Sequence, residues 1–300
     1  MKKINNFLNR HSAAVMIAPY AFLFSLFIII PVTAAVILSF TDFNSVQFPK
    51  WVGFDNYVQL FTNDSVFMQK VLPNTITFAV FVGAGGYVLG FLLAWCLSQI
   101  TKGPRTVLAI IIYSPSMTGG VLISTIWNVV FNGDKSGYLN YILLKAEIID
   151  KPIAWLQSEK YLLLIMIIVS LWSSMGVGFL AMLSGILNVN EELYEAGYID
   201  GIKNRFQEIV YITVPAAKPQ MLFGAIMAIV NTFQTGNIGV TLSGSNPTPN
   251  YAGQLIVTHI EDFGYLRYEM GYAAAVSVVL LIGIYLLSKG TEKALSANDE

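Results

Sequence analysis

Charged residues are scarce in this sequence. Aspartate, glutamate, lysine and arginine make up 12% of its 300 residues, about half of the roughly 25% found in soluble domains. The few charges nearly balance, with a formal net charge of −1 at pH 7, so nothing indicates nucleic acid as a partner. Hydrophobic residues account for 55% of the chain, and the mean hydropathy is +0.62. This composition is typical of a membrane protein.

Cysteine is represented by one residue, Cys96, which lies within an apolar run. A single cysteine excludes an internal disulfide framework and a cysteine-based zinc site. The sequence also lacks the Gly-x4-Gly-Lys-[Ser/Thr] pattern of a nucleotide-binding loop. We therefore predict no metal site, no bound cofactor and no catalytic residue on this chain.

Long apolar blocks fill most of the sequence. Six of them contain no Asp, Glu, Lys, Arg or His: residues 13–40, 71–99, 107–130, 161–186, 220–243 and 270–288. A membrane-spanning helix needs about 20 mainly apolar residues, and its backbone groups must bond within the segment. We predict an all-α integral membrane protein with six transmembrane helices, which form a single domain over residues 13–288.

The first block follows Lys2, Lys3 and Arg10, as the core of a signal peptide would. Its apolar run is far longer than the roughly 7–15 residues of such a core. We interpret it as an uncleaved first span that is able to bend at Pro31, because proline removes a helical hydrogen bond.

The distribution of positive charge predicts an orientation. With the N-terminus in the cytoplasm, ten of the 17 lysines and arginines fall in the inside segments and seven in the outside segments. Positive residues favour the cytoplasmic side. We therefore predict cytoplasmic ends at residues 1–12 and 289–300 and a cytoplasmic loop at residues 187–219.

The 187–219 loop has the pattern of two short helices. Asn190 is suited to cap the first, whose first turn carries Glu191 and Glu192, and Asp200-Gly201 marks a turn. The second is amphipathic, and Pro215 is expected to end it. Its predicted apolar face is made by Phe206, Ile209, Val210 and Thr213. The small residues Ala196 and Gly197 would let another surface approach the first helix closely.

The same loop carries a recognisable motif. It reads Glu195-Ala196-Gly197-Tyr198-Ile199-Asp200-Gly201, then Phe206, then Ile212-Thr213-Val214-Pro215. This resembles the EAA loop of binding-protein-dependent ABC importer permeases, with Gly197 in place of the second alanine and Ile202 where alanine is usual. Residues 39–43, 52–57, 73–75, 193–196 and 270–275 are similar to the carbohydrate-uptake branch of that family.

The resemblance implies the type I ABC importer fold and a location in the bacterial inner membrane. It implies partners as well: a second permease, two ATPase subunits that carry ATP and magnesium, and an extracytoplasmic solute-binding protein that delivers a sugar. The residues that it implies for ATPase coupling are Glu195, Ala196, Gly197, Asp200 and Gly201. Taken without the resemblance, the same segment reads as a solvated amphipathic loop.

Uncharged polar and aromatic residues at membrane depth are candidates for a sugar pathway. Asn231, Gln234 and Asn237 share about 60° of one helix face, and residues 235–239 are expected to loosen that helix, as at many transporter sites. Further candidates are Tyr113, Asn128 and Trp172. The alternative is that these side chains bond between helices as structural contacts.

Small residues indicate helix packing and a break. Gly86 and Gly90 in the second span, and Ser170, Ser174 and Gly178 in the fourth, would let helices approach closely. Residues 113–120, which include proline and two glycines, are expected to interrupt the third span.

Two other functions remain open. One is a permease of the same kind for a polyol or a glycerol phosphate. The other is a carrier or channel that works alone. Spans without ionisable residues argue against ion coupling, so any energy for transport would have to enter through a partner.

Overall fold

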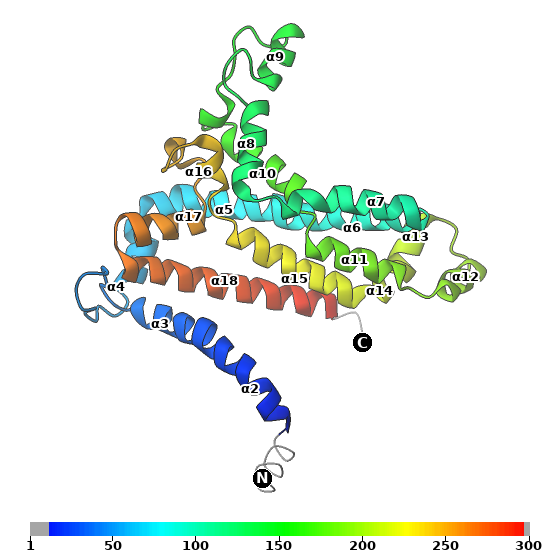
Figure 1. The fold of residues 1–300 in the computed structure, drawn as a ribbon, viewed down its shortest axis with the longest axis horizontal. Helices are drawn as coiled ribbons and strands as arrows, with labels where there is room; N and C mark the ends of the chain where they lie inside the picture. The colour runs from blue at the N-terminus through cyan, green and yellow to red at the C-terminus, as the bar shows by residue number, and fades with distance from the viewer. Residues whose placement is uncertain (1–11, 297–300) are drawn as a thin grey trace. The chain divides into compact units, whose positions relative to one another are not determined.

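Helices make up nearly all of the regular structure in the computed structural model, which describes residues 12–296 (Figure 1). Within those residues there is no β-strand, and an isolated antiparallel bridge joins Thr41 and Trp51. The predicted all-α class is confirmed.

Three helices are long and apolar enough to cross a membrane by themselves: Met16–Leu38, Phe67–Ser98 and Met270–Ala294. Three bent pairs also qualify if each pair is one span: Lys102–Met117 with Leu122–Val130, Leu162–Ser173 with Val177–Leu187, and Arg205–Ala216 with Lys218–Gln234. The structure therefore offers three to six spans. The first two bent pairs correspond to the third and fourth apolar blocks, and the last joins part of the predicted 187–219 loop to the first part of the fifth block.

The chain divides into two units, the first made of residues 1–63 and 260–279 and the second of residues 64–259 and 280–300. The helices that begin in the first unit's described part are α2 (Ser12–Phe24), η1 (Ser25–Ile29), α3 (Ile30–Leu38), α4 (Asp55–Val58), η2 (Gln59–Asn63), η9 (Asp262–Leu266) and α18 (Met270–Ser296). The π-helical turn η1 directly precedes Pro31, and the helix runs through the proline without a break.

A loop at residues 41–52 organises the first unit. The Asn56 amide donates to the carbonyls of Ser39 (2.8 Å) and Thr41 (2.9 Å). The Gly271 amide, at the start of α18, donates to the Phe43 carbonyl at 3.0 Å. A side chain at position 271 would collide with the Thr41 carbonyl, so the close approach requires glycine.

The second unit holds the remaining elements. The second span of the chain is continuous here, and the third to fifth are broken. The first elements are η3 (Phe67–Val71), α5 (Leu72–Phe78), η4 (Ala79–Ala84), α6 (Gly85–Ser98), α7 (Lys102–Tyr113), η5 (Ser114–Met117), α8 (Gly120–Val130), α9 (Tyr138–Lys145), η6 (Trp155–Gln157) and α10 (Leu162–Ser173). Those that follow are α11 (Val177–Leu187), α12 (Glu191–Ile199), α13 (Arg205–Glu208), η7 (Ile209–Thr213), α14 (Val214–Ala216), α15 (Lys218–Gln234), α16 (Ile238–Ser243), η8 (Pro249–Tyr251) and α17 (Ile256–Glu261).

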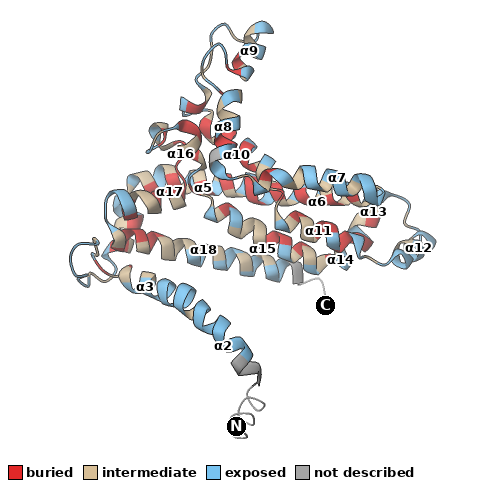
Figure 2. Cartoon of the chain, viewed as in Figure 1, coloured by how far each residue is buried: buried red, intermediate tan, exposed pale blue. Residues whose placement is uncertain are grey.

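Two hydrophobic clusters form the core of this unit. The first consists of Phe78, Val82, Ile123, Phe131, Leu156, Leu162, Ile165, Met166, Ile167, Val169, Leu242 and Leu255. The second consists of Ala94, Leu97, Met175, Phe179, Met182, Leu183, Ile186, Ala217 and Met221. Outside these clusters many large apolar side chains stay exposed, among them Ile110 and Ile111 on α7 and most of α2 and α3 (Figure 2), as expected for surfaces that face hydrocarbon.

Small residues bring the helices of the second unit together. A Cβ at Gly178 of α11 would lie 3.3 Å from the Gly224 Cα of α15, and one at Gly185 would lie 2.8 Å from the Gln220 Cβ. A Cβ at Gly86 would lie 3.0 Å from the Ser174 hydroxyl. The predicted small-residue faces of the second and fourth spans therefore do meet.

Candidate functional site

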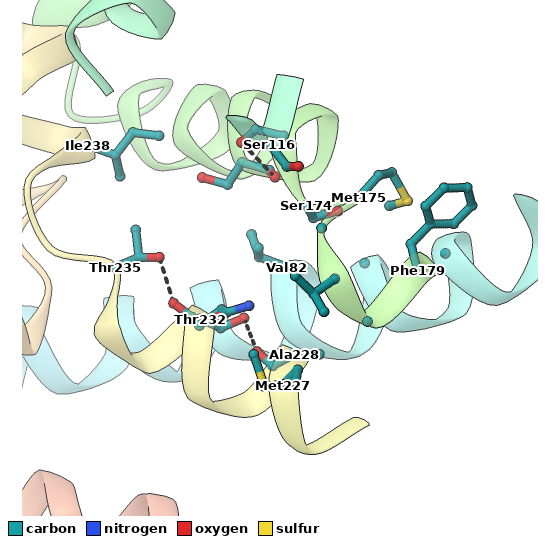
Figure 3. A pocket seen from close by; sticks show the side chains of 18 of the residues that line it. Val82, Ser116, Ser174, Met175, Phe179, Met227, Ala228, Thr232, Thr235 and Ile238 are labelled. Carbon is teal, nitrogen blue, oxygen red and sulfur yellow. Dashed lines mark hydrogen bonds between the residues drawn. The ribbon is translucent and has the colours of Figure 1, made fainter. Parts of the chain in front are cut away.

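A cavity of about 610 Å³ lies between the two hydrophobic clusters of the second unit (Figure 3). Val82, Ile123 and Leu242 of the first cluster line one part of it. Phe179 and Met182 of the second cluster line another. Its size falls within the usual range for small-molecule sites, about 300–1,000 Å³.

Three helix breaks meet at this cavity. The break between α7 and α8 contributes Tyr113 and Ser116, and the break between α15 and α16 contributes Thr235 and Asn237. The third, between α10 and α11, bends the fourth span by 44° and contributes residues 173–176. Backbone that leaves a helix at membrane depth is tolerated where it lines a cavity, and broken helices of this kind form the substrate sites of many transporters.

Hydroxyl and amide groups supply the polar part of the lining. They belong to Tyr87, Tyr113, Ser116, Ser124, Ser170, Ser173, Ser174, Asn231, Thr232, Thr235, Asn237 and Thr241. None of the lining residues is Asp, Glu, Lys, Arg or His. The cavity therefore suits a neutral solute that offers hydrogen-bonding groups, because a charged solute would find no opposite charge in the wall.

Most of these hydroxyls already bond to their own helices. The hydroxyl of Ser116 donates to the Tyr113 carbonyl at 2.7 Å and that of Thr232 to the Ala228 carbonyl at 2.7 Å (Figure 3). The Ser174 hydroxyl donates to the Leu171 carbonyl at 2.8 Å. Ser170 is different: its side chain is 7% exposed, and its hydroxyl has no hydrogen-bond partner within the described part of the chain. A buried polar group of this kind costs free energy until something bonds to it.

Three of the six predicted pathway residues line the cavity and three do not. Tyr113, Asn231 and Asn237 line the cavity, whereas Gln234, Trp172 and Asn128 lie outside its lining. The helix that was expected to carry three amides on one face ends at Gln234, so the common face is lost. The expected loosening at residues 235–239 is confirmed, as is the break within residues 113–120.

Trp172 and Asn128 have other surroundings. The Trp172 ring packs edge to face on Trp127, with ring centroids 5.5 Å apart. Asn128 is half-buried on α8, beyond the break that lines the cavity. The break at residues 173–176 was not predicted, and the consecutive serines Ser173 and Ser174 followed by Gly176 are the signal that a closer reading of the fourth span offers.

The segment 190–217, here called the loop segment, forms a second candidate site between α11 and α15. The Asn190 side chain accepts a hydrogen bond from the Glu192 amide at 3.1 Å, which confirms the predicted cap of α12. Asn204 caps α13 in the same way through the Gln207 amide, at 2.8 Å. Gly201 joins the two helices with φ +98°, a backbone conformation that side chains disfavour.

Side-chain bonds hold the two helices of the loop segment together. Glu208, 3% exposed, accepts from the Arg205 guanidinium at 2.6 Å and from the Tyr198 hydroxyl of α12 at 2.9 Å. The hydrogen bond to Glu208 is the main cause that raises the pKa of Tyr198 above 10.0, and the same carboxylate raises the pKa of Arg205. Tyr194 and Thr213 add a contact between their hydroxyl oxygens at 3.2 Å.

The predicted apolar face of the second helix is wrong in part. Phe206 is 74% exposed and Val210 is 42% exposed, whereas Ile212 and Thr213 are buried. The π-helical turn η7 at Ile209–Thr213 is wider than an α-helical turn, so residues from Ile209 onward depart from the predicted α-helical face.

Pro215 also does not end this helix. The chain continues through it as α14, and the break comes at Ala217, where it bends by 84° into α15. Proline is tolerated here because it occupies a first-turn position of α14.

The predicted coupling residues lie on one segment but face different ways. Glu195, Ala196 and Asp200 are exposed. Gly197 faces inward instead: a Cβ there would lie 2.6 Å from Cδ1 of Ile212 and 3.0 Å from Cδ1 of Ile202. The space at Gly197 is therefore filled by the segment's own residues.

Known proteins are similar to this chain in sequence and in fold. The family described as "Binding-protein-dependent transport system inner membrane component" matches residues 86–289. The probable ABC transporter permease protein YesP of Bacillus subtilis (strain 168) is 30% identical over 275 residues, which cover 91% of this chain and 86% of that protein. The arabinooligosaccharides transport system permease protein AraP of the same strain is 29% identical over 273 residues, with 90% and 84% covered.

Among solved structures, a bacterial ABC transporter involved in the import of the acidic polysaccharide alginate matches with a TM-score of 0.81. The identity is 21%, and the match covers 99% of this chain and 100% of that chain. The fold is therefore that of a type I ABC importer permease. The chain belongs to the family of binding-protein-dependent transport system inner membrane components, which confirms the resemblance seen in the loop motif.

Proposed function

We propose that this chain is the membrane-spanning subunit of an ATP-driven importer for a sugar or oligosaccharide, and that its cavity forms half of the translocation pathway. The observation that carries the proposal is the neutral lining of hydroxyls and amides at the meeting point of three helix breaks. Sugars are neutral and offer many hydroxyls, so such a wall suits them. The similarity to an arabinooligosaccharides permease supports the same solute class.

Aromatic rings in the lining fit this solute class as well. Tyr87, Tyr113 and Phe179 line the cavity, and flat apolar rings pack well against the C–H faces of sugar rings. A glycerol phosphate is a poorer fit, because its charge would need a cation that the lining residues do not include. A neutral polyol remains the nearest rival.

The proposal includes a topology. Six spans lie over residues 13–288 when the bent pairs of the third and fourth spans each count as one span and the fifth span runs through α15 and α16, with residues 1–12 and 289–300 in the cytoplasm. The positive charges of the connections support this orientation. The membrane would be the bacterial inner membrane, and the loop segment would face the cytoplasm.

The loop segment is the proposed contact with an ATPase partner. Glu195, Ala196 and Asp200 would form the docking surface, while Gly197 and Gly201 shape the fold of the segment. Because α11 and α15 flank this segment and pack through glycines, a push on it would move both helices and the breaks that line the cavity. The complete importer would contain a second permease, two ATPase subunits that bind ATP and magnesium, and a solute-binding protein.

Reconstitution tests the proposal. The chain is co-purified with its neighbouring permease, ATPase and binding protein and placed in lipid vesicles, and we expect sugar to stimulate both ATP hydrolysis and uptake. A panel of sugars, polyols and glycerol phosphate then compares the solute classes. Uptake by the purified chain alone, without ATPase or ATP, would overturn the proposal in favour of a stand-alone carrier or channel.

A further inference from the structure

Residues 251–259, here called the strap, contact both the start of the second span and the break in the fifth span. The Asn74 side chain of α5 donates to the carbonyls of Tyr251 at 2.9 Å and Gln254 at 3.3 Å. The Ile256 amide donates to the Thr75 hydroxyl at 3.1 Å. These bonds fix the strap against α5.

A buried acid and a histidine extend the same attachment. The imidazole Nε2 of His259 lies 3.0 Å from Oδ2 of Asp64, and the two side chains are 4% and 10% exposed. The Phe67 amide donates to Oδ1 of Asp64 at 2.7 Å, and the Phe67 ring packs on His259 with centroids 5.5 Å apart. These contacts hold the His259 end of the strap against the residues that precede α5.

The other side of the strap contacts the break in the fifth span. The hydroxyl of Thr258, 1% exposed, donates to the Gly236 carbonyl at 2.7 Å. Gly236 is buried between α15 and α16, and a Cβ there would lie 2.6 Å from Cγ1 of Val257. There is likewise no room for a side chain at Gly239 beside Gly253.

The Thr258 bond meets a specific need of the break. A carbonyl in a break between two helices has no partner from the helical pattern, and a buried carbonyl needs a donor. The Gly236 carbonyl has that donor in Thr258, whose neighbour in the sequence is the anchored His259. Residues on either side of Gly236, namely Thr235, Asn237 and Ile238, line the cavity (Figure 3).

We propose that Thr258, anchored by the Asp64–His259 pair, is a positioning residue that sets the geometry of the fifth-span break and thereby of the cavity wall. Its importance for transport rests on the proposed function of the cavity. Its effect on the break does not, so the two are measured separately.

The test uses the whole reconstituted transporter in lipid nanodiscs, which leave both faces open to reagents. Cys96 is replaced by serine, and Ile238→Cys provides a reporter next to the break. The rate of reaction with a small water-soluble methanethiosulfonate is measured with Thr258, Thr258→Val or Thr258→Ser. Thr106→Val is the matched control, because its hydroxyl bonds only within its own helix, to the Lys102 carbonyl.

We expect Thr258→Val to change the labelling rate at residue 238 by about fivefold, the factor that corresponds to loss of one hydrogen bond. Thr258→Ser keeps the hydroxyl and should restore the parental rate, and Thr106→Val should not alter it. A second reporter, Ser98→Cys, should react at the same rate in all variants, which separates a local effect from general loosening of the fold.

Equal labelling rates at residue 238 with valine and threonine would overturn the inference. If Thr258→Val does not assemble, Thr258→Ala and His259→Gln are measured in the same way and carry the same expectation. Uptake is measured in complexes without reporters. Altered labelling with unchanged uptake would uphold the positioning role of Thr258 and count against the cavity as the pathway.

Discussion

The cavity and the loop segment are held in shape by different kinds of contact. Around the cavity, hydroxyls such as those of Ser116 and Thr232 bond to their own helices, and the helices meet through apolar side chains and glycines. In the loop segment, side-chain bonds such as Tyr198 to Glu208 cross from one helix to the next.

This difference suits two different tasks. Helices that share few directional bonds can shift past one another at small cost, because a hydroxyl bonded within its own helix moves with that helix. Helices tied by a buried carboxylate move as one body, because displacement would leave Glu208 unpaired. The loop segment therefore has the properties of a rigid lever, and the cavity those of a compartment that changes shape.

Among the variants of the loop segment, substitution of Gly197 should have the largest effect on ATP hydrolysis. A valine there must displace η7, because Cδ1 of Ile212 lies 2.6 Å from the position of the new Cβ. Overpacking of this kind costs about 1–3 kcal/mol. We expect sugar-stimulated ATP hydrolysis of the reconstituted complex to fall by about tenfold, the factor that corresponds to about 1.4 kcal/mol.

Two variants control that measurement. Gly290→Val adds the same side chain where no atom lies within 4 Å, and it should leave hydrolysis unchanged. Ile212→Ala in the Gly197→Val chain removes the obstructing methyl group and should restore part of the activity. Full activity in Gly197→Val alone would contradict the view that the segment is rigid.

Replacement of Glu208 tests the charged core of the loop segment. Glu208→Gln weakens the hydrogen bonds to Arg205 and Tyr198. We expect the free energy of unfolding to fall by at most about 2 kcal/mol, because the exposed Arg205 guanidinium is screened by solvent. Thermal unfolding of the purified complex at neutral pH measures it. An unchanged unfolding temperature would show that these bonds do not make the segment rigid.

The difference in unfolding temperature between the parent protein and Glu208→Gln should depend on pH. The carboxylate of Glu208 raises the pKa of Tyr198, so the contribution of this bond is fully present below pH 10.0 and is lost as pH rises through the folded-state pKa. In Glu208→Gln the pKa of Tyr198 returns toward its ordinary value. The difference between the two unfolding temperatures should therefore narrow above pH 10.0.

The sequence predicted the features of the cavity and of the loop segment that depend on neighbouring residues in the chain. The cap at Asn190 and the fifth-span break at residues 235–239 follow from residues adjacent in the sequence. The close contact between the helices at Gly86 and Ser174 was also predictable, because close helix packing requires small side chains.

Features that depend on distant contacts were not predictable in this way. The break after Ser173 contains no proline and has only the weak local signal of Ser174 and Gly176, and the helices on its two sides, α10 and α11, pack in different hydrophobic clusters. The π-helical turn η7 shifts the phase of the residues that follow it from that of a regular α-helix, and Ile212 within it is buried. The partner of Gly236, Thr258, lies far along the chain and carries no motif.

Gly201 gives a smaller effect that separates backbone conformation from packing. No atom lies within 4 Å of a Cβ at this position, but its φ is +98°. Gly201→Ala should therefore cost only the strain of that conformation, about 1–2 kcal/mol, seen as reduced affinity of the ATPase subunit for the permease. Gly103→Ala has equal space and an ordinary φ, and it should bind the ATPase as the parent does. Equal affinity for Gly201→Ala would contradict a conformational role for this glycine.

Ser170 gives the smallest expected effect on stability and tests the cavity side of the comparison. Ser170 lines the cavity, and its hydroxyl is buried without a partner in the described residues, so Ser170→Ala should leave the unfolding temperature unchanged or slightly raised. If a sugar hydroxyl bonds to Ser170 during passage, uptake should fall by about threefold to tenfold.

Ser98→Ala is the matched control, because its hydroxyl donates to the Trp95 carbonyl within α6 and it does not line the cavity. Uptake that stays at the parental rate in Ser170→Ala would mean that solute does not use this hydroxyl. A fall in uptake together with a large fall in unfolding temperature would instead assign Ser170 to the stability of the fold.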